Sequence, residues 1–290
     1  MRTGAKGVRQ VARAATERLR RAGVPEPEAS AEVLLSELLG VGRADLALHE
    51  GPLTEEQART YEAWISRRER REPVQRILGY AYFRHLILEL NEETLIPRPD
   101  TESVVEAALE RIDARGGSCR VLDIGTGSGA IAIAIAQERP GCEVHATDIS
   151  ESALEMARRN AEKYGVAVEF HRADVTRGLD LPEKSLDVLV SNPPYVDEPS
   201  AAKRLAPEVL RWDPPAALFS GADELAVFRR IFAETPPLLS GGADVVLEIG
   251  DGQAQAVFDL GERAGFERAG IRNDLAGTPR AVMLRWTDRR

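Results

Sequence analysis

The sequence of 290 residues has few of the residues that build covalent or metal-bound cores. Its two cysteines, Cys119 and Cys142, provide neither a disulfide framework nor a cluster of metal ligands, which favours a reducing cytoplasm. Its four histidines show no spacing typical of zinc ligands. No stretch approaches the roughly 18 consecutive apolar residues that a membrane span needs. We therefore expect a globular, cytoplasmic protein without a metal or a membrane anchor.

Charge is unevenly distributed along the chain. The net charge is −9, yet residues 1–21 carry seven basic side chains against the single acid Glu17. An arginine-rich start is also typical of organelle-targeting segments. Apolar residues recur there at helical spacing, however, which favours a folded amphipathic helix (Val8, Val11, Ala15 and Leu19). The acidic whole argues against a protein that holds duplex DNA, so we expect no direct nucleic-acid binding.

The periodicity of the sequence divides the chain into three parts. Residues 1–72 read as a helical domain, with helices over 7–22, 27–40 and 54–71 and a short one over 44–49. Residues 73–95 read as a hairpin or linker. In the remainder, 96–290, strands alternate with helices, which is typical of an α/β fold with a mainly parallel sheet. The seven predicted strands are 120–124, 143–148, 168–173, 186–191, 243–249, 266–273 and 280–286, and the predicted helices are 100–114, 129–138, 151–164, 222–238 and 253–264.

Polar residues follow the first three of these strands, at the edge where parallel sheets bind ligands. The glycine-rich turn Gly125-Thr126-Gly127-Ser128-Gly129 follows Asp123 and opens a helix, so its backbone can approach a ligand closely. Asp148 lies 19 residues past Gly129, about the separation at which a carboxylate reaches ribose hydroxyls. Asp174, followed by Val175, is placed to accept from an exocyclic amine. Together these residues predict a nucleoside site, and its acids suit a cationic cofactor better than a pyrophosphate.

The fourth strand runs into Ser191-Asn192-Pro193-Pro194-Tyr195. The prolines end the strand and fix the backbone, because each locks φ and lacks an N–H. A rigid turn alone does not explain the amide before the prolines or the phenol after them. Asn192 and the carbonyl of Pro193 can accept hydrogen bonds from a planar substrate amine or amide, with Tyr195 as a flat wall. We therefore predict Asn192, Pro193 and Tyr195 as catalytic residues.

The motifs in this order resemble those of S-adenosylmethionine-dependent methyltransferases that act on nitrogen. Three more stretches resemble the release factor glutamine methyltransferase family (PrmC/HemK): Glu72–Gly79, Leu95–Glu102 and Asn273–Gly277. The resemblance implies a seven-stranded Rossmann-like methyltransferase sheet, mostly parallel with one antiparallel strand, behind a small N-terminal helical domain that recognises the substrate. It implies S-adenosylmethionine as cofactor, S-adenosylhomocysteine as product, and the glutamine of the Gly-Gly-Gln motif of class I peptide chain release factors as substrate. We expect a monomer.

The expected site residues follow from the same motifs. The cofactor set is Asp123, Gly125, Thr126, Gly127, Ser128, Gly129, Asp148, Asp174, Val175 and Asn192, and the substrate set is Asn192, Pro193, Pro194, Tyr195 and Arg98.

Four alternative functions stay open. A relative of the family modifies a ribosomal protein glutamine, and a DNA adenine-amino methyltransferase uses a similar turn. A binding module without turnover would not need every chemical position filled, and a nicotinamide enzyme, which the pattern Gly-x-Gly-x-x-Ala also fits, leaves the proline turn unexplained.

Overall fold

The structure is a computed structural model that describes residues 7–49, 51–199 and 201–288. The chain forms two compact units. The first comprises the N-terminal residues up to Gly79 together with Pro207–Trp212, and the second comprises Tyr80–Ala206 and Asp213–Arg290. Among the described residues, no helix has the length and apolar character that crossing a membrane requires.

The first unit is helical. Its elements are α1 (Val8–Arg21), α2 (Pro27–Leu39), the 3-10 helix η1 (Arg43–Leu48), α3 (Glu55–Glu69), α4 (Val74–Leu78) and α9 (Pro207–Trp212). Leu19, Leu34 and Ile65 place one apolar face of each long helix in a common core. Thr54 starts α3 with a capping box. Its side chain accepts from the backbone amide of Gln57, and the Gln57 side chain accepts from the backbone amide of Thr54.

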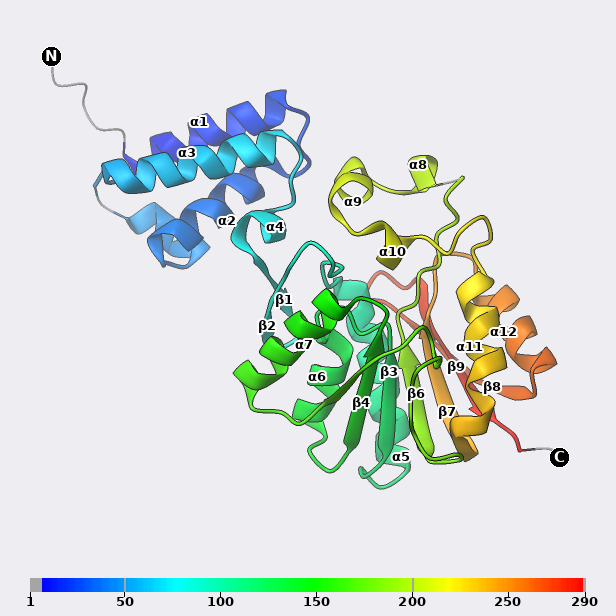
Figure 1. Cartoon of the computed structure of the whole chain (residues 1–290). Helices are drawn as coiled ribbons and strands as arrows, with labels where there is room; N and C mark the ends of the chain where they lie inside the picture. The colour runs from blue at the N-terminus through cyan, green and yellow to red at the C-terminus, as the bar shows by residue number, and fades with distance from the viewer. Residues whose placement is uncertain (1–6, 50, 200, 289–290) are drawn as a thin grey trace, which may run out of the picture. The chain divides into compact units, whose positions relative to one another are not determined.

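The second unit contains a sheet of seven strands in the described part of the chain, shown with the helices that cover it in Figure 1. The strand order is β5-β4-β3-β6-β7-β9-β8, and only β9 runs antiparallel to its neighbours. The seven predicted strands and the single antiparallel strand are thus confirmed. The strands are β3 (Arg120–Ile124), β4 (Glu143–Asp148), β5 (Glu169–Arg172), β6 (Leu186–Ser191), β7 (Leu239–Glu248), β8 (Phe266–Asn273) and β9 (Pro279–Trp286).

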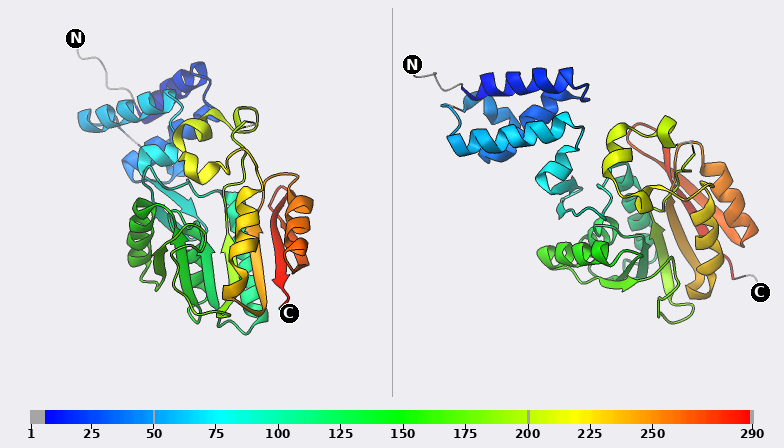
Figure 2. Two further views of the ribbon diagram at one scale, coloured as in Figure 1. Left: turned by 45° about the vertical axis from the view of Figure 1, so that its right-hand side comes forward. Right: turned by 45° about the horizontal axis from the view of Figure 1, so that its top comes forward.

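Helices cover both faces of this sheet (Figures 1 and 2). On one face, α5 (Glu102–Ala114), α6 (Ala130–Glu138) and α7 (Glu151–Tyr164) bury a core that includes Val121, Val144 and Val190. On the other, α11 (Ala226–Glu234) and α12 (Ala254–Arg263) pack over Leu122, Leu189 and Val245. Because side chains alternate along a strand, each buried strand supplies both cores, which explains its nearly continuous apolar sequence.

A short hairpin precedes the sheet in the chain, within residues 73–95, where the sequence left a hairpin or a linker open. Strands β1 (Tyr80–Phe83) and β2 (Leu86–Glu89) pair antiparallel, and Phe83, Leu86 and Leu88 are buried in the core under α5 and α6. The hairpin is therefore an integral part of the second unit rather than a free linker.

Several elements differ from the sequence-based expectation. The helix expected over 222–238 begins at Ala226, because Asp223 turns the chain by accepting from the Leu225 amide, and it ends before Pro236 in the 3-10 helix η3 (Pro236–Leu238). Strand β7 starts at Leu239, four residues earlier than the predicted start at residue 243, so it includes the Gly241-Gly242 pair. Short helices α8 (Ala201–Arg204), α9 and α10 (Pro215–Leu218), and the 3-10 helix η2 (Pro99–Thr101), were not distinguished.

Candidate active site

A pocket of about 390 Å³ lies at the carboxyl ends of the central strands of the second unit. Its size is within the usual range of sites for small ligands. Eight of the ten residues expected to bind a cofactor line it, namely Gly125, Thr126, Gly127, Ser128, Asp148, Asp174, Val175 and Asn192. Asp123 and Gly129 do not line the pocket and lie behind it. Pro193, Pro194 and Arg98 from the expected substrate set are also on its wall.

The glycine-rich turn forms one wall of the pocket. Gly125, Gly127 and Gly129 have φ angles of 73°, 56° and 86°, a left-handed region that favours glycine. The amides of Gly125 and Thr126 both donate to the carbonyl of Thr147, at 2.8 and 2.9 Å, so the turn is tied to the end of β4. A side chain on Gly129 would come within 2.7 Å of Ile133 Cδ1, which explains the third glycine by packing rather than by ligand contact.

Asp148 joins this turn to the start of α7. Its carboxylate accepts from the Gly127 amide and from the Ser150 amide, each at 2.9 Å. Burial raises the pKa of this carboxyl, and the backbone amides oppose the shift. Ser150 caps α7 by accepting from the Ala153 amide. Because each carboxylate oxygen has a second lone pair, Asp148 can still accept from ribose hydroxyls.

Asp123 supports the turn from below rather than facing the pocket. Its side chain is completely buried, and burial raises its pKa to about 7, opposed by the Thr126 hydroxyl and the Ala132 amide. The cofactor role expected of Asp123 stays a prediction, since this carboxyl does not line the pocket and its pKa is influenced by Thr126 of the turn.

Asp174 and Val175 form the opposite wall. Asp174 Oδ1 accepts from Arg230 Nη1 at 2.8 Å, a contact that the sequence did not reveal, and Arg230 itself lines the pocket. Val175 has a φ of 60°, which is rare for a β-branched residue and marks a backbone held by its surroundings. The side chain of Asp174 is thus shared between an ion pair and the pocket.

The proline turn presents Asn192 to the pocket in a defined orientation. Asn192 Nδ2 donates to the hydroxyl oxygen of Thr101 at 3.2 Å. The preceding Ser191 is buried and its hydroxyl donates to the carbonyl of Ile124 at 2.7 Å, which fastens β6 to β3. Since its nitrogen is engaged by Thr101, Asn192 offers its oxygen as the free acceptor.

Tyr195 anchors the turn instead of lining this pocket. Its hydroxyl donates to Glu248 Oε1 at 3.1 Å, and its carbonyl accepts from Gln253 Nε2 at 3.0 Å. Its ring lies against Gly250, where a side chain would come within 3.1 Å of Tyr195 Cδ2. Burial, followed by the nearby charge of Glu248, raises the pKa of Tyr195. These contacts restrain the turn from its far end.

Glu248, at the end of β7, is completely buried behind the turn. Burial raises its pKa to about 7, while hydrogen bonds from Thr101 and Tyr195 and the charge of Arg280 oppose the shift. The Glu248 carboxyl thus connects Thr101, which orients Asn192, with Tyr195, which ends the proline turn. The sequence showed an acid at a strand end but not these contacts.

Two further contacts were missed because their partners are distant in sequence. Arg98 forms an ion pair with the buried side chain of Asp213, which also accepts from the Ile96 amide.

Asn160 on α7 donates to the carbonyls of Ser128 and Glu89, at 2.9 and 3.0 Å, and accepts from the Glu89 amide at 2.8 Å. Asn160 therefore fastens the glycine-rich turn to the hairpin strand β2. An asparagine inside a helix pattern was the available signal.

The charges around the pocket fit a cationic ligand. Glu93, Asp148 and Asp174 contribute carboxylates to its wall. Of the described lining residues, Arg98 and Arg230 are the cations, and each is paired with a carboxylate. A dinucleotide needs partners for its pyrophosphate, whereas a sulfonium with an adenosine matches the acids and apolar residues here (Pro97, Ile131 and Phe219 among the latter).

Comparisons with known proteins agree with this site. Residues 10–79 match the PrmC N-terminal domain and residues 103–241 match the methyltransferase small domain. A release factor glutamine methyltransferase from Rhodospirillum rubrum is 41% identical over 271 residues, covering 92% of this chain and 82% of that protein. One from Streptomyces coelicolor is 41% identical over 274 residues, covering 93% and 95%.

A solved structure shows the same fold. A methyltransferase from Pyrococcus furiosus superposes with a TM-score of 0.53 at 20% identity, covering 70% of this chain and 89% of the other. The matched methyltransferase domain and the two relatives define the class of the protein as a methyltransferase, and the solved structure shares its fold. The chain belongs to the release factor glutamine methyltransferase family.

Proposed function

We propose that the protein transfers a methyl group from S-adenosylmethionine to the side-chain amide nitrogen of the glutamine in the Gly-Gly-Gln motif of class I peptide chain release factors. The relatives in Rhodospirillum and Streptomyces carry the name of this activity. The observation that supports it most directly is the orientation of Asn192, whose nitrogen is engaged by Thr101 and whose oxygen is left as an acceptor beside the pocket.

S-adenosylmethionine would supply an electrophilic methyl group on a positively charged sulfur. Its adenosine would lie between the glycine-rich turn and Val175, with the ribose hydroxyls on Asp148 and the adenine amine on Asp174. The backbone amides of Gly125 and Thr126 are already bonded to Thr147, so the turn needs little rearrangement on binding. A site organised in advance loses less entropy when the ligand binds.

A glutamine amide is a weak nucleophile because its nitrogen lone pair is delocalised into the carbonyl. In the proposed arrangement, one amide hydrogen donates to Asn192 Oδ1 and the other to the carbonyl of Pro193. These fixed acceptors aim the nitrogen and place negative potential where positive charge develops. The nitrogen, held in this way, would take the methyl group that S-adenosylmethionine supplies, with the neutral thioether as the leaving group, and the surplus amide proton would pass to solvent.

Pro193 and Pro194 keep this geometry because each fixes φ, and Tyr195 restrains the end of the turn through Glu248 and Gln253. Arg98, held by Asp213, would contact the protein substrate near the pocket. We further propose that residues 1–72 recognise the release factor and residues 96–290 carry the chemistry. Residues 73–95 join the two, and their hairpin packs into the second unit. The enzyme would work as a monomer in the cytoplasm, without binding nucleic acid directly.

The test is transfer of labelled methyl from S-adenosylmethionine to a purified class I release factor, with the site located by peptide mass spectrometry. We expect label on the Gly-Gly-Gln glutamine. Asn192→Ala should reduce single-turnover transfer on the order of 100- to 1,000-fold at saturating cofactor, as loss of one preorganised group does in other enzymes. Asn192→Asp keeps the shape but adds charge beside the sulfonium, and cofactor binding should persist in both variants.

A matched control is Gln255→Ala, because Gln255 is an exposed amide on α12 that does not line the pocket. Its transfer rate should equal that of the wild type. Label on a ribosomal protein glutamine or on adenine in DNA, with none on the release factor, would replace the proposed substrate. A wild-type rate in Asn192→Ala would mean that the turn merely ends a strand.

A further inference from the structure

Two neighbouring strands at the edge of the sheet carry the same short pattern. Strand β4 begins Glu143-Val144-His145 and strand β5 begins Glu169-Phe170-His171. The parallel register places His145 beside Glu169 and Thr147 beside His171. Since side chains two residues apart share a face of a strand, the acids and histidines of both strands point to one side. The histidines are 26 residues apart in sequence, which is why spacing along the chain gave no sign of a metal site.

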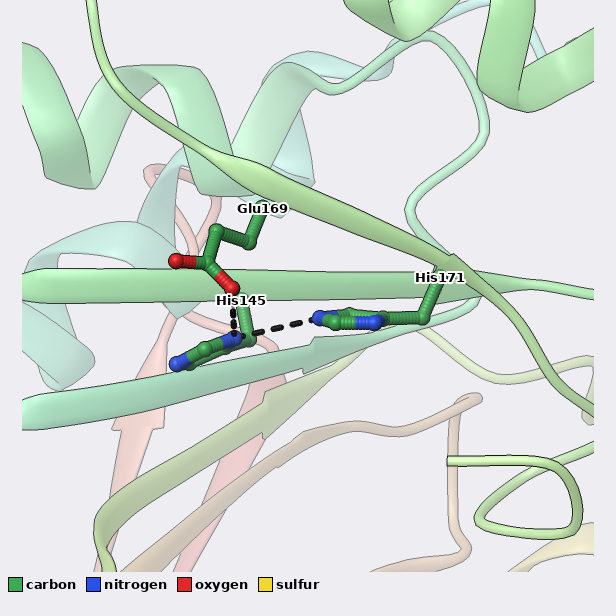
Figure 3. Close-up of side chains that lie close together, drawn as sticks. All are labelled: His145, Glu169 and His171. Atoms are coloured by element: carbon green, nitrogen blue, oxygen red, sulfur yellow. Dashed lines mark hydrogen bonds and ion pairs between the residues drawn. The ribbon is translucent and has the colours of Figure 1, made fainter. Parts of the chain in front are cut away.

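Figure 3 shows the side chains of His145, Glu169 and His171 converging from the two strands. His145 Nδ1 lies 3.1 Å from His171 Nε2 and 3.5 Å from Glu169 Oε2. One candidate ligand atom from each of the three residues falls within 4.8 Å of the others. Ligand atoms around tetrahedral Zn²⁺, at its usual bond length to nitrogen, are about 3.4 Å apart. The separations from His145 therefore match a shared ion.

The surroundings of His145 direct its Nδ1 toward the other two residues of the cluster. Its other nitrogen, Nε2, is 3.0 Å from Glu143 Oε1, and the second oxygen of Glu143 is paired with Arg120 at 2.8 Å. The carboxylate fixes a hydrogen on Nε2, as carboxylates do for histidines that bind zinc. Nδ1 faces both His171 Nε2 and Glu169 Oε2. A cation placed among these three atoms could accept an electron pair from each of them.

We propose that His145, Glu169 and His171 form a site for a divalent cation of intermediate softness, with Zn²⁺ as the best fit. Two imidazoles and one carboxylate are a common donor set for zinc. The His145 side chain is only 2% exposed whereas that of Glu169 is 67% exposed, so a fourth position opens toward solvent and can hold water. The site lies apart from the residues that line the cofactor pocket.

The consequence for the fold is a cross-link at the outer edge of the sheet. Strand β5 is the terminal strand on this side and pairs only with β4 within the described sheet. The chain leaves β5 directly into Ala173, Asp174 and Val175 on the pocket wall. An ion that joins β4 to β5 would therefore hold the base of that wall and stabilise the folded state by binding to it alone.

The experiment measures zinc binding to the full chain with any affinity tag removed, by competition with a chromophoric chelator. We expect one Zn²⁺ per chain, and the Co²⁺ form should show the intense visible absorption of four-coordinate cobalt. At about a hundredfold excess over the dissociation constant, zinc should raise the melting temperature of the second unit by about 5 to 10 °C.

Three variants distinguish this site from adventitious binding. Glu143→Gln removes the partner of His145 and should weaken zinc binding about 10- to 100-fold. His171→Ala removes a ligand and should weaken it further, and His85→Ala alters an exposed histidine outside the cluster and should leave it unchanged. Equal zinc affinity in wild type and His171→Ala, or no stoichiometric binding by the wild type, would overturn the proposal and leave a hydrogen-bonded histidine pair.

Discussion

The buried carboxyl of Glu248 should make the stability of the second unit depend on pH, and Glu248→Gln should remove that dependence. Burial raises the pKa of Glu248 from 4.5 to about 7. Between these values the folded protein retains a proton that the unfolded chain has released. The free energy of unfolding therefore falls as pH rises through this window and levels off above pH 7.

The size of the effect follows from the shift. One pKa unit corresponds to about 1.36 kcal/mol, so a rise from 4.5 to about 7 costs the folded state about 3 kcal/mol once the carboxyl is charged. Glutamine keeps the shape and an oxygen that accepts from the Tyr195 hydroxyl. We expect the variant to match the wild type near pH 4.5 and to be about 3 kcal/mol more stable at pH 8. Asp123, with its own raised pKa, is present in both proteins and cancels in the comparison.

The measurement is urea unfolding at several pH values, followed by fluorescence of Trp286. This residue packs against Phe266 in the second unit, with ring centroids 4.9 Å apart. Trp64 and Trp212 belong to the first unit and are replaced by phenylalanine, so that a single unit is observed. Glu155→Gln, at an exposed position on α7, is the matched control. Parallel pH profiles for wild type and Glu248→Gln would refute the argument.

Three other outcomes are expected. S-adenosylmethionine at about 100 times its dissociation constant should stabilise the fold by about 2.7 kcal/mol in thermal unfolding, and Asp148→Ala should weaken its binding; stabilisation by NADH instead would contradict the cofactor assignment. Thr101→Val should lower the rate of methyl transfer about 10- to 100-fold without changing cofactor affinity, because Asn192 loses the acceptor that orients it. Thr101→Ser should restore the rate, and equal rates in Thr101→Val and wild type would exclude an orienting role for Thr101. A fragment of residues 80–290 should bind S-adenosylmethionine in calorimetry yet fail to methylate an intact release factor; undiminished methylation would show that residues 1–72 serve another purpose.

Much of the fold could be predicted because periodicity and strand ends are local properties. Strands β3, β4 and β6 and helix α7 occupy the expected residues, since each is a long patterned segment with clear caps. Helices α8, α9 and α10 are four to six residues long and lie among prolines, so no pattern had room to develop. Residues 207–212 belong to the first unit although they lie between strands β6 and β7 in sequence, a tertiary association that no local pattern indicates.

The site was predictable where topology alone determines it. Parallel strands end at one edge, so Asp148, Asp174 and Asn192 were expected together and do line one pocket. The contacts that orient these residues come from elsewhere in the chain. Thr101 is 91 residues from Asn192 and Arg230 is 56 residues from Asp174, and nothing in the sequence joins those pairs. The repeated Glu-x-His on successive strands was a usable signal that a search for histidine spacing overlooks.

The side chain of Asn160 ties the hairpin to the methyltransferase sheet, so the hairpin must stay with the sheet when the domain is cut from the chain. Its amide links the carbonyl of Ser128 in the glycine-rich turn to both backbone groups of Glu89 in the hairpin. A chain rejoined to a new N-terminal domain at residue 96 would lose the hairpin and leave this buried amide with unmet hydrogen bonds next to the cofactor turn. A junction before Tyr80 would keep them. The transplantable module, in gene fusion or in protein engineering, thus begins at Tyr80, sixteen residues before the boundary at residue 96 that the sequence predicted.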